Sequence, residues 1–243
     1  RLSDGWHVFC FRKLGVAGKS SVIAMKPPRR DGMAMGDHIE TADKLAWTGE
    51  RFIPGMRGKI ALEHVHRYLM ARQLAKGYDV LDIACGEGYG ANLLADVAKT
   101  VIGVDISENA IEHAKNKYTK PNLSFIVGSC AAIPLPDNSI DLCVSFETIE
   151  HHDQHDIMML EIKRVLRQNG ILIISSPDKY YYSIEPDHKN PFHVKELYRH
   201  EFEDLISSYF NKAIFCGQRV LYGSGIFCER QATNHVSSSI QEP

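Results

Sequence analysis

The stretch Val80-Leu81-Asp82-Ile83-Ala84-Cys85-Gly86-Glu87-Gly88-Tyr89-Gly90 decides the fold of this chain. An apolar run typical of a buried strand breaks into glycines at every second position, which predicts a strand, a tight turn and the start of a helix. Gly86 and Gly88 allow positive φ and a close approach of the backbone to a ligand. Because the N–H groups that open a helix attract negative charge, the turn predicts a site for a phosphate or a carboxylate.

The glycine spacing alone leaves two classes of cofactor open. A dinucleotide fingerprint reads G-x-G-x-x-G, and Ala91 stands where the third glycine belongs, a replacement that the pattern tolerates. The dinucleotide pattern does not require Asp82, a carboxylate within the strand. An acidic group at that place would face a cationic ligand and not a pyrophosphate.

The pattern D-x-x-C-G-x-G-x-G after a hydrophobic strand resembles the first motif of class I S-adenosylmethionine-dependent methyltransferases. The resemblance covers about residues 60–230 and implies a Rossmann-like fold with S-adenosylmethionine as the cofactor. In that family the glycine turn holds the methionyl part of the cofactor, and the strand aspartate lies near its ammonium group. The residues that match this part of the motif are Asp82, Ala84, Cys85, Gly86 and Gly88.

Length and composition fit one α/β domain. The chain has 243 residues, of which 44% are hydrophobic, enough for one sizeable core. A net charge of −2 gives no electrostatic footprint for nucleic acid or an anionic membrane. The chain has no apolar run long enough for a membrane span, and its six cysteines stand singly. We therefore expect a cytoplasmic protein with reduced cysteines that acts on a small molecule.

From residue 61 onward, helix-like and strand-like segments alternate. The helix expected over 61–76 has apolar residues at helical spacing, namely Leu62, Val65 and Leu69. Strand-like segments are expected at 78–84, 100–105, 123–127, 140–146 and 171–175, with a closing antiparallel pair at 212–217 and 226–230. This order predicts a doubly wound, mainly parallel, seven-stranded α/β sheet with an antiparallel closing strand, whose ligand lies at the carboxyl ends of the strands.

We divide the chain into four segments. They are an N-terminal extension or linker at 1–40, a lid segment at 41–60, the methyltransferase domain at 61–232 and a C-terminal tail at 233–243. Within the first segment, Trp6 to Phe11 is expected to be a short strand that mirrors the stretch at 225–228. An alternative interpretation makes the first segment the tail of an upstream domain.

Asp105 ends the second expected strand, about twenty residues after the glycine turn, where a carboxylate accepts hydrogen bonds from both ribose hydroxyls. The same position binds ribose in the family, and Ile106 would then pack beside the adenine. The alternative, that Asp105 caps the next helix, competes with Ser107, which already offers that cap. The acid that commonly reads the adenine amino group is absent here, which leaves Ser129, Cys130 and Ala131 as the expected base contacts.

The run Phe146-Glu147-Thr148-Ile149-Glu150-His151-His152 follows the fourth expected strand, at the edge where the methyl group should point. Phe146 is assigned to the cofactor site. Methyl transfer is an in-line displacement, so the protein must align the reacting atoms and exclude water. His151, followed by His152, is the candidate base for a hydroxyl acceptor, because imidazole titrates near neutral pH. The alternative places both histidines on an exposed loop without a role in the chemistry.

Glu147, Glu150 and His151 form an E-x-x-E-H pattern. It resembles the divalent-metal motif of ubiquinone-pathway O-methyltransferases and of small-RNA terminal 2′-O-methyltransferases. Such a cation would lower the pKa of an acceptor hydroxyl in place of a protein base, and His188 or His193 would add a fourth ligand. The alternative is a pair of glutamates that make hydrogen bonds at a helix start.

Residues 48–55, 63–68 and 190–197 resemble methyltransferases found with bacterial glycosyltransferases in surface-polysaccharide biosynthesis. This resemblance implies methylation of a sugar or glycan hydroxyl, a glycosyltransferase as partner, and a lid over the cofactor formed by Glu50 and Arg51. The same two residues would otherwise form a surface ion pair of little energetic weight.

The loop at 178–193 is expected to shape the acceptor pocket, where Tyr180, Tyr181 and Tyr182 would stack on a sugar ring or only cover the sheet edge. Three other functions stay open. They are a non-catalytic cofactor-binding domain of a glycosyltransferase system, an RNA 2′-O-methyltransferase and an NAD-dependent oxidoreductase. The near-neutral charge disfavours the RNA enzyme, because it offers little grip on phosphates.

Overall fold

The computed structural model describes the backbone of residues 6–12, 58–220 and 224–228, and the side chains of 58–218. In chain order the elements are β1 (Trp6–Arg12), α1 (Lys59–Leu74), β2 (Asp79–Ile83), α2 (Tyr89–Leu94), β3 (Thr100–Asp105), α3 (Glu108–Lys117), β4 (Leu123–Val127), β5 (Ile140–Phe146), the short helix η1 (Ile149–His151), α4 (His155–Val165), β6 (Leu166–Pro177), the π-helix η2 (Tyr180–Ile184), α5 (Arg199–Tyr209), β7 (Lys212–Val220) and β8 (Ser224–Cys228).

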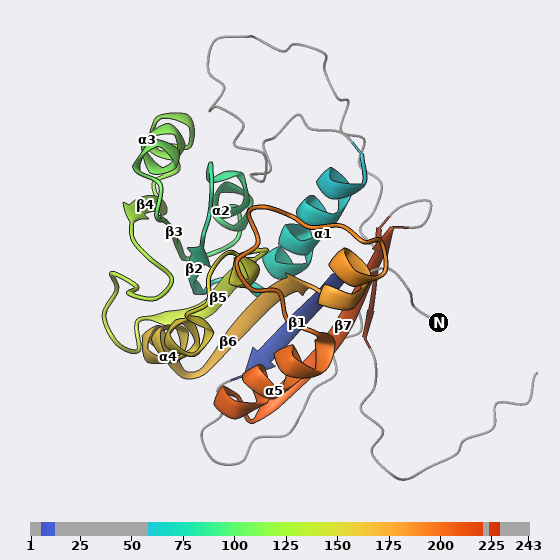
Figure 1. The fold of residues 1–243 in the computed structure, drawn as a ribbon. Coiled ribbons are helices and arrows are strands. Elements are labelled where there is room, and N and C mark those ends of the chain that lie inside the picture. The colour runs from blue at the N-terminus through green and yellow to red at the C-terminus, as the bar shows by residue number, and fades with distance from the viewer. Residues whose placement is uncertain (1–5, 13–57, 221–223, 229–243) are drawn as a thin grey trace, which may run out of the picture.

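These strands form one sheet in the order β4-β3-β2-β5-β6-β1-β7-β8, shown in Figure 1. The five strands from β4 to β6 are parallel. At the other end, β1 is antiparallel to both of its neighbours, and β7 pairs antiparallel with β8. The expectation of a Rossmann-like, mainly parallel α/β sheet is confirmed.

The expected number of seven strands is wrong, because β1 adds an eighth. Trp6 lies opposite Pro177 of β6 on one side and opposite Gln218 of β7 on the other. The short strand expected near the N-terminus does form, but as an interior strand of the sheet and not as part of a linker. Its own sequence pattern indicates extended structure and carries no information on which strands it joins.

Two apolar clusters cover the two faces of the sheet, because successive strand residues point to opposite sides. Val80 and Leu142 pack with α1, α2 and α3 on one face. Leu81 and Cys143 pack with α4 and α5 on the other. Strand β2 is therefore buried on both sides, which explains its unbroken apolar character. The glycine turn that follows it is held at the carboxyl edge of the sheet.

Helix α1 buries a different face from the one expected. Leu62 and Leu69 are 49% and 42% exposed, and Val65 is only partly buried, whereas Glu63 and Arg67 are buried. The apolar spacing predicted the helix correctly and its buried face wrongly. The reason lies in tertiary contacts. The buried face carries Glu63 and Arg67 beside Tyr68, Met70 and Ala71, and Arg67 reaches the carboxyl ends of the strands.

The thiols of Cys85, Cys130 and Cys143 are free. Cys216 is disulfide-bonded, and Cys228 lies opposite it in the β7–β8 ladder. The expectation of six reduced cysteines is therefore wrong at Cys216.

Among the described residues, no helix has the length and apolarity needed to cross a membrane. The proposed lid residues Glu50 and Arg51, most of the segments at 1–40 and 41–60, and the tail at 233–243 lie outside the described part of the chain.

Candidate active site

The turn after β2 places three residues in the left-handed region of backbone space. Ala84 has φ of 57°, Gly86 of 56° and Gly88 of 89°. Gly88 precedes the first residue of α2, and a Cβ built on it would lie 2.7 Å from the Phe125 ring. The left-handed conformation of Ala84 costs about 1–2 kcal/mol. Such strain clusters at functional sites, where the surrounding structure enforces it.

Asp105 ties this turn to the end of β3. Its carboxylate accepts hydrogen bonds from the backbone N–H of Gly86 and of Ser107, each at 2.9 Å. Ser107 is the N-cap of α3, and its hydroxyl accepts from Ala110 N–H at 3.3 Å. The cap therefore belongs to Ser107, as expected. Two carboxylate oxygens offer about four lone pairs, so Asp105 keeps acceptor capacity for the hydroxyls of a ribose.

The expected adenine side lies beside Asp105. Ile106 is 77% exposed, and the backbone carbonyl of Asp105 accepts a hydrogen bond from Gly128 N–H at 2.9 Å. This bond brings the turn that contains Ser129 to the end of β3. The Ser129 hydroxyl accepts from Ala131 N–H at 3.1 Å. Contacts between these residues and a base stay a prediction.

Asp82 lies buried below the glycine turn. Its two carboxylate oxygens are 3.1 and 3.2 Å from the hydroxyl of Tyr68, which comes from α1. Burial raises the pKa of Asp82 to about 8, against the lowering effect of the hydrogen bonds from Tyr68 and from Ala91 N–H. In the described structure the carboxyl group thus joins β2 to α1 and α2. Its contact with an ammonium group stays a prediction, and Tyr68 is a partner that the sequence did not reveal.

The side chains of Cys85 and Phe146 belong to the core. Both are buried, and the Phe146 ring packs edge-on against Tyr68 with centroids 4.9 Å apart. A ligand at this edge would meet mainly the backbone of these two residues.

Glu147, the first residue after β5, has a left-handed backbone with φ of 52°. Its carboxylate is 2.8 Å from Nη1 of the buried Arg67 and 2.5 Å from the hydroxyl of Ser175. The structure does not bring Glu147 together with Glu150 and His151 as a triad of cation ligands. Its carboxylate is held by groups of α1 and β6.

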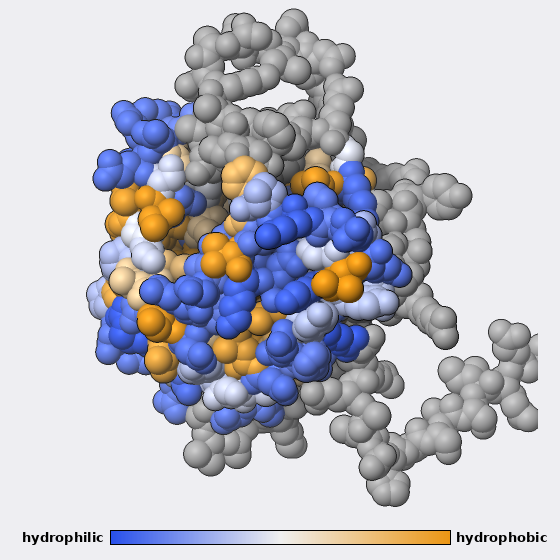
Figure 2. Space-filling view, in the orientation of Figure 1, coloured by the Kyte–Doolittle hydropathy of each residue, from blue (hydrophilic) through white to orange (hydrophobic). Residues whose placement is uncertain are grey.

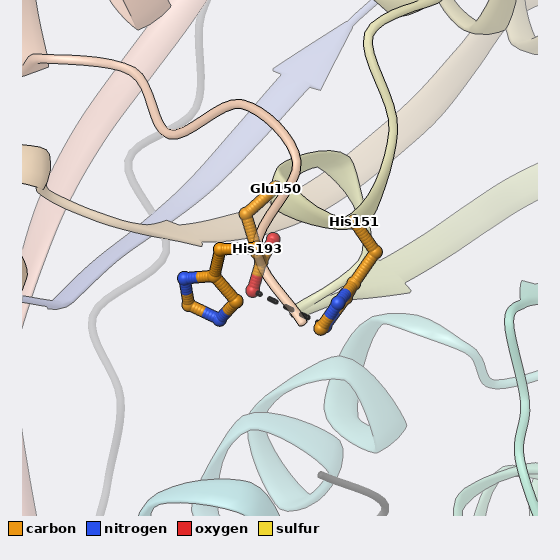
Figure 3. A group of neighbouring side chains, drawn as sticks. All are labelled: Glu150, His151 and His193. Atoms are coloured by element: carbon orange, nitrogen blue, oxygen red, sulfur yellow. Dashed lines mark ion pairs between the residues drawn. The ribbon is translucent and has the colours of Figure 1, made fainter. Parts of the chain in front are cut away.

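A different set of ligand atoms converges at this edge, as Figure 3 shows. One oxygen of Glu150 and ring nitrogens of His151 and His193 all lie within 4.8 Å of one another. Backbone N–H groups of Val194 and Lys195 donate to the Glu150 carbonyl at 2.9 and 3.1 Å. These bonds hold the loop that carries His193 against η1. His193 was one of two candidates for an additional ligand, and the other, His188, is not in the set.

The hydrogen bonds of His151 and His193 set their tautomers. Nδ1 of His151 lies 3.1 Å from the carbonyl oxygen of Phe192, and Nδ1 of His193 lies 2.6 Å from a carboxylate oxygen of Glu196. Each acceptor requires a proton on Nδ1, so that a neutral ring carries its lone pair on Nε2. Nε2 of His151 is 4.0 Å from the Glu150 carboxylate. This geometry suits a proton acceptor or a metal ligand.

His152 has a different environment. Its Nδ1 accepts a hydrogen bond from Gln154 N–H at 3.1 Å, and its Nε2 lies 3.5 Å from Cys130 Sγ and 3.3 Å from Met158 Sδ. Burial lowers the pKa of His152, and His155 adds to this effect. Because both ring nitrogens have partners within the protein, the geometry favours His151 over His152 as the base.

The loop that follows β6 supports the same edge. The ring of Tyr182 stacks on His193 with centroids 4.9 Å apart, and its hydroxyl accepts from the side-chain amide of Asn190 at 2.9 Å. Tyr180 is 46% exposed. Tyr182 therefore positions His193, while Tyr180 presents a ring to solvent.

Comparisons with known proteins show which family this chain resembles. Residues 81–174 match the family model described as a methyltransferase domain. Two relatives are each named a probable S-adenosylmethionine-dependent methyltransferase. The one from Mycolicibacterium smegmatis is 39% identical over 167 residues, which are 68% of this chain and 64% of that protein. The one from Mycobacterium tuberculosis strain H37Rv is 38% identical over 177 residues, with 71% and 64% covered. The segment that these relatives match is similar to an S-adenosylmethionine-dependent methyltransferase domain.

The chain spans about 64% of the length of these two relatives. Solved structures show the same fold. A methyltransferase from Aquifex aeolicus has a TM-score of 0.51 at 23% identity, covering 67% of this chain and 87% of that one. One from Methanosarcina mazei has a TM-score of 0.54 at 17% identity, covering 66% and 94%.

Proposed function

We propose that this protein transfers the methyl group of S-adenosylmethionine to a hydroxyl group, and that the acceptor is a sugar or glycan precursor. The observation that supports the transfer to oxygen is the tautomer of His151. Its Nδ1 donates to the Phe192 carbonyl, and this leaves Nε2 to accept a proton at the carboxyl edge of the sheet. A hydroxyl nucleophile needs such a base, because it must lose its proton as the new bond forms.

The residues of the cofactor site fit the nucleoside and methionine parts of that molecule. Asp105 offers acceptor atoms to a ribose, the exposed Ile106 offers an apolar surface to a base, and the turn at Gly86 and Gly88 offers backbone groups to the methionyl part. When bound, S-adenosylmethionine supplies an electrophilic methyl group on a sulfonium centre.

In the proton transfer that we propose, Nε2 of His151 takes the hydroxyl proton of the acceptor. The ring then becomes a cation, and the Glu150 carboxylate at 4.0 Å stabilises it. Because Glu150 is buried, this interaction is screened less than a surface ion pair would be. Phe192 keeps the ring oriented through its carbonyl group.

A divalent cation is a second candidate for the same role. Glu150, His151 and His193 would hold it, and the acceptors on the two Nδ1 atoms match the way proteins orient metal-binding imidazoles. When bound, such a cation lowers the pKa of an acceptor hydroxyl.

The sugar acceptor and a glycosyltransferase partner rest on the resemblance of three sequence segments to methyltransferases of surface-polysaccharide synthesis, whereas a cytoplasmic location rests on the lack of a long apolar run in the sequence. The exposed ring of Tyr180 supports the first of these, since aromatic rings stack on sugar rings.

The test measures S-adenosylhomocysteine formation with a panel of sugar nucleotides, glycosides and lipid-linked sugars. Turnover that is lost in His151→Gln and insensitive to EDTA supports the base. Turnover that EDTA abolishes and that Mg²⁺, Mn²⁺ or Zn²⁺ restores supports the cation. Specific cofactor binding without turnover on any acceptor would overturn the proposed methyl transfer to a sugar hydroxyl.

A further inference from the structure

A buried polar network joins α1 to the ends of three strands. Nε of Arg67 donates to the side-chain oxygen of Gln218 on β7 at 2.8 Å, and the Gln218 amide donates to the Glu63 carbonyl at 3.1 Å. On the other side, Nη1 of Arg67 lies 2.8 Å from the Glu147 carboxylate. One guanidinium group therefore links α1 with β7 and with the residue that follows β5.

Ser175 of β6 completes this network. Its hydroxyl donates to the Glu147 carboxylate at 2.5 Å, and its oxygen accepts from Glu147 N–H at 3.2 Å and from Arg67 Nη1 at 3.3 Å. Both the side chain and the backbone of Glu147 are thus fixed. The left-handed conformation of Glu147 is unfavourable for a residue with a Cβ, so these contacts hold the chain in it.

A buried ion pair contributes little net stability to a protein. Removing two charges from water costs about as much as their attraction returns, and apolar residues of similar volume are often at least as stabilising. Helix α1 nevertheless buries Arg67 while Leu62 and Leu69 stay exposed. Departures of this kind from ordinary packing are expected where a protein holds a functional group in place.

The residue held by this network begins the segment that carries the proposed base. Glu147 is followed directly by Thr148, whose carbonyl accepts from His151 N–H at 3.0 Å. Glu150, in the same turn, binds the loop of Val194 through its own carbonyl. A change in the backbone at Glu147 would therefore move both His151 and the partner loop that orients its ring.

We propose that Arg67 is a positioning residue for methyl transfer, which acts through Glu147 to set the place and the tautomer of His151. The expected effect of Arg67 on turnover rests on the proposed function. The orientation of the His151 ring can be measured without any turnover. Arg67 itself needs no contact with either substrate.

The experiment compares Arg67→Met, Glu147→Gln, the double variant and Arg67→Lys in the full chain. Arg167→Met is the matched control. Nη1 of Arg167 pairs with Asp79 and Asp141 at 2.9 and 2.7 Å, at the amino ends of β2 and β5 and thus away from the carboxyl edge of the sheet. For each variant we measure the melting temperature, the affinity for S-adenosylmethionine, kcat, KM for the acceptor and the ¹⁵N spectrum of the histidine rings.

We expect kcat to fall at least tenfold in Arg67→Met and Glu147→Gln, with cofactor affinity within about threefold of the wild type. The ¹⁵N signals of His151 should shift from the Nδ1-protonated form toward a mixture of tautomers. Arg67→Lys should recover part of both properties. Arg167→Met should change neither, even where it lowers the melting temperature.

The double variant separates positioning from stability, because it removes both charges of the Arg67–Glu147 pair together. We expect it to melt at a higher temperature than either single variant and to keep the low kcat and the altered His151 spectrum. Recovery of kcat together with stability would overturn the inference, as would an unchanged His151 spectrum in the single variants. If the proposed acceptor class is wrong, turnover is missing in the wild type as well. The ¹⁵N spectrum of His151 then decides alone whether Arg67 positions this ring.

Discussion

Replacing Gly88 with alanine should lower the free energy of unfolding, because Gly88 lies in the tight turn after β2. In Gly88→Ala the new residue must keep φ of 89°, which costs about 1–2 kcal/mol for a residue with a Cβ. The new Cβ would also lie 2.7 Å from two atoms of the Phe125 ring and 2.9 Å from the Ala114 Cβ. Overpacking of this kind costs about 1–3 kcal/mol. The sum is a loss of about 2–5 kcal/mol in the free energy of unfolding.

Gly77→Ala is the matched control for this prediction. Gly77 has φ of 74°, but a Cβ there would meet nothing within 4 Å. It should therefore lose only the backbone part, about 1–2 kcal/mol. Urea unfolding measures both variants, and melting temperatures should fall by about 2–4 °C per kcal/mol for a domain of this size. Equal losses in the two variants would refute the claim that the turn is packed against Phe125.

Three further predictions concern single side chains. Burial raises the pKa of Asp82 from 3.8 to about 8, so the stability contributed by its protonated form is complete below about pH 4 and is lost as the pH rises through 8. The melting temperature of Asp82→Asn should therefore exceed that of the wild type increasingly as the pH rises from 5 to 9. The same difference in melting temperature at every pH would contradict the raised pKa. Ile106→Glu should lower the affinity for S-adenosylmethionine about tenfold or more in calorimetry. It should not lower the melting temperature, since this side chain is 77% exposed. An unchanged affinity would show that Ile106 is not part of the cofactor site. His152→Gln should retain most of the turnover that His151→Gln loses, and the reverse order would make His152 the base.

The sequence predicted the parts of the site that depend on local pattern. Positive φ in the turn after β2 follows from Gly86 and Gly88, and the place of Asp105 follows from the length of one strand–helix–strand unit. His193 was predicted as one of two alternative candidates for an additional ligand, and the structure places it beside Glu150 and His151.

What the sequence did not predict depends on contacts between distant residues. Arg67 is 80 positions before Glu147, and no local pattern indicates that these two charges meet in the protein interior. The buried face of α1 was assigned from its apolar residues, which fails because the charged face reaches the strand ends. The interior position of β1 has the same cause, since a strand shows its own extended pattern and not its partners.

We propose that the turn after β2 and the carboxylate of Asp105 bind S-adenosylmethionine. Titration calorimetry with S-adenosylmethionine and with NAD, on the wild type and on Asp105→Ala, tests it most directly. Hydrogen bonds to a charged group contribute about 1.5–3 kcal/mol, so we expect S-adenosylmethionine to bind the wild type and to bind Asp105→Ala at least tenfold more weakly, with no heat from NAD. Binding of NAD without binding of S-adenosylmethionine would rule out this cofactor.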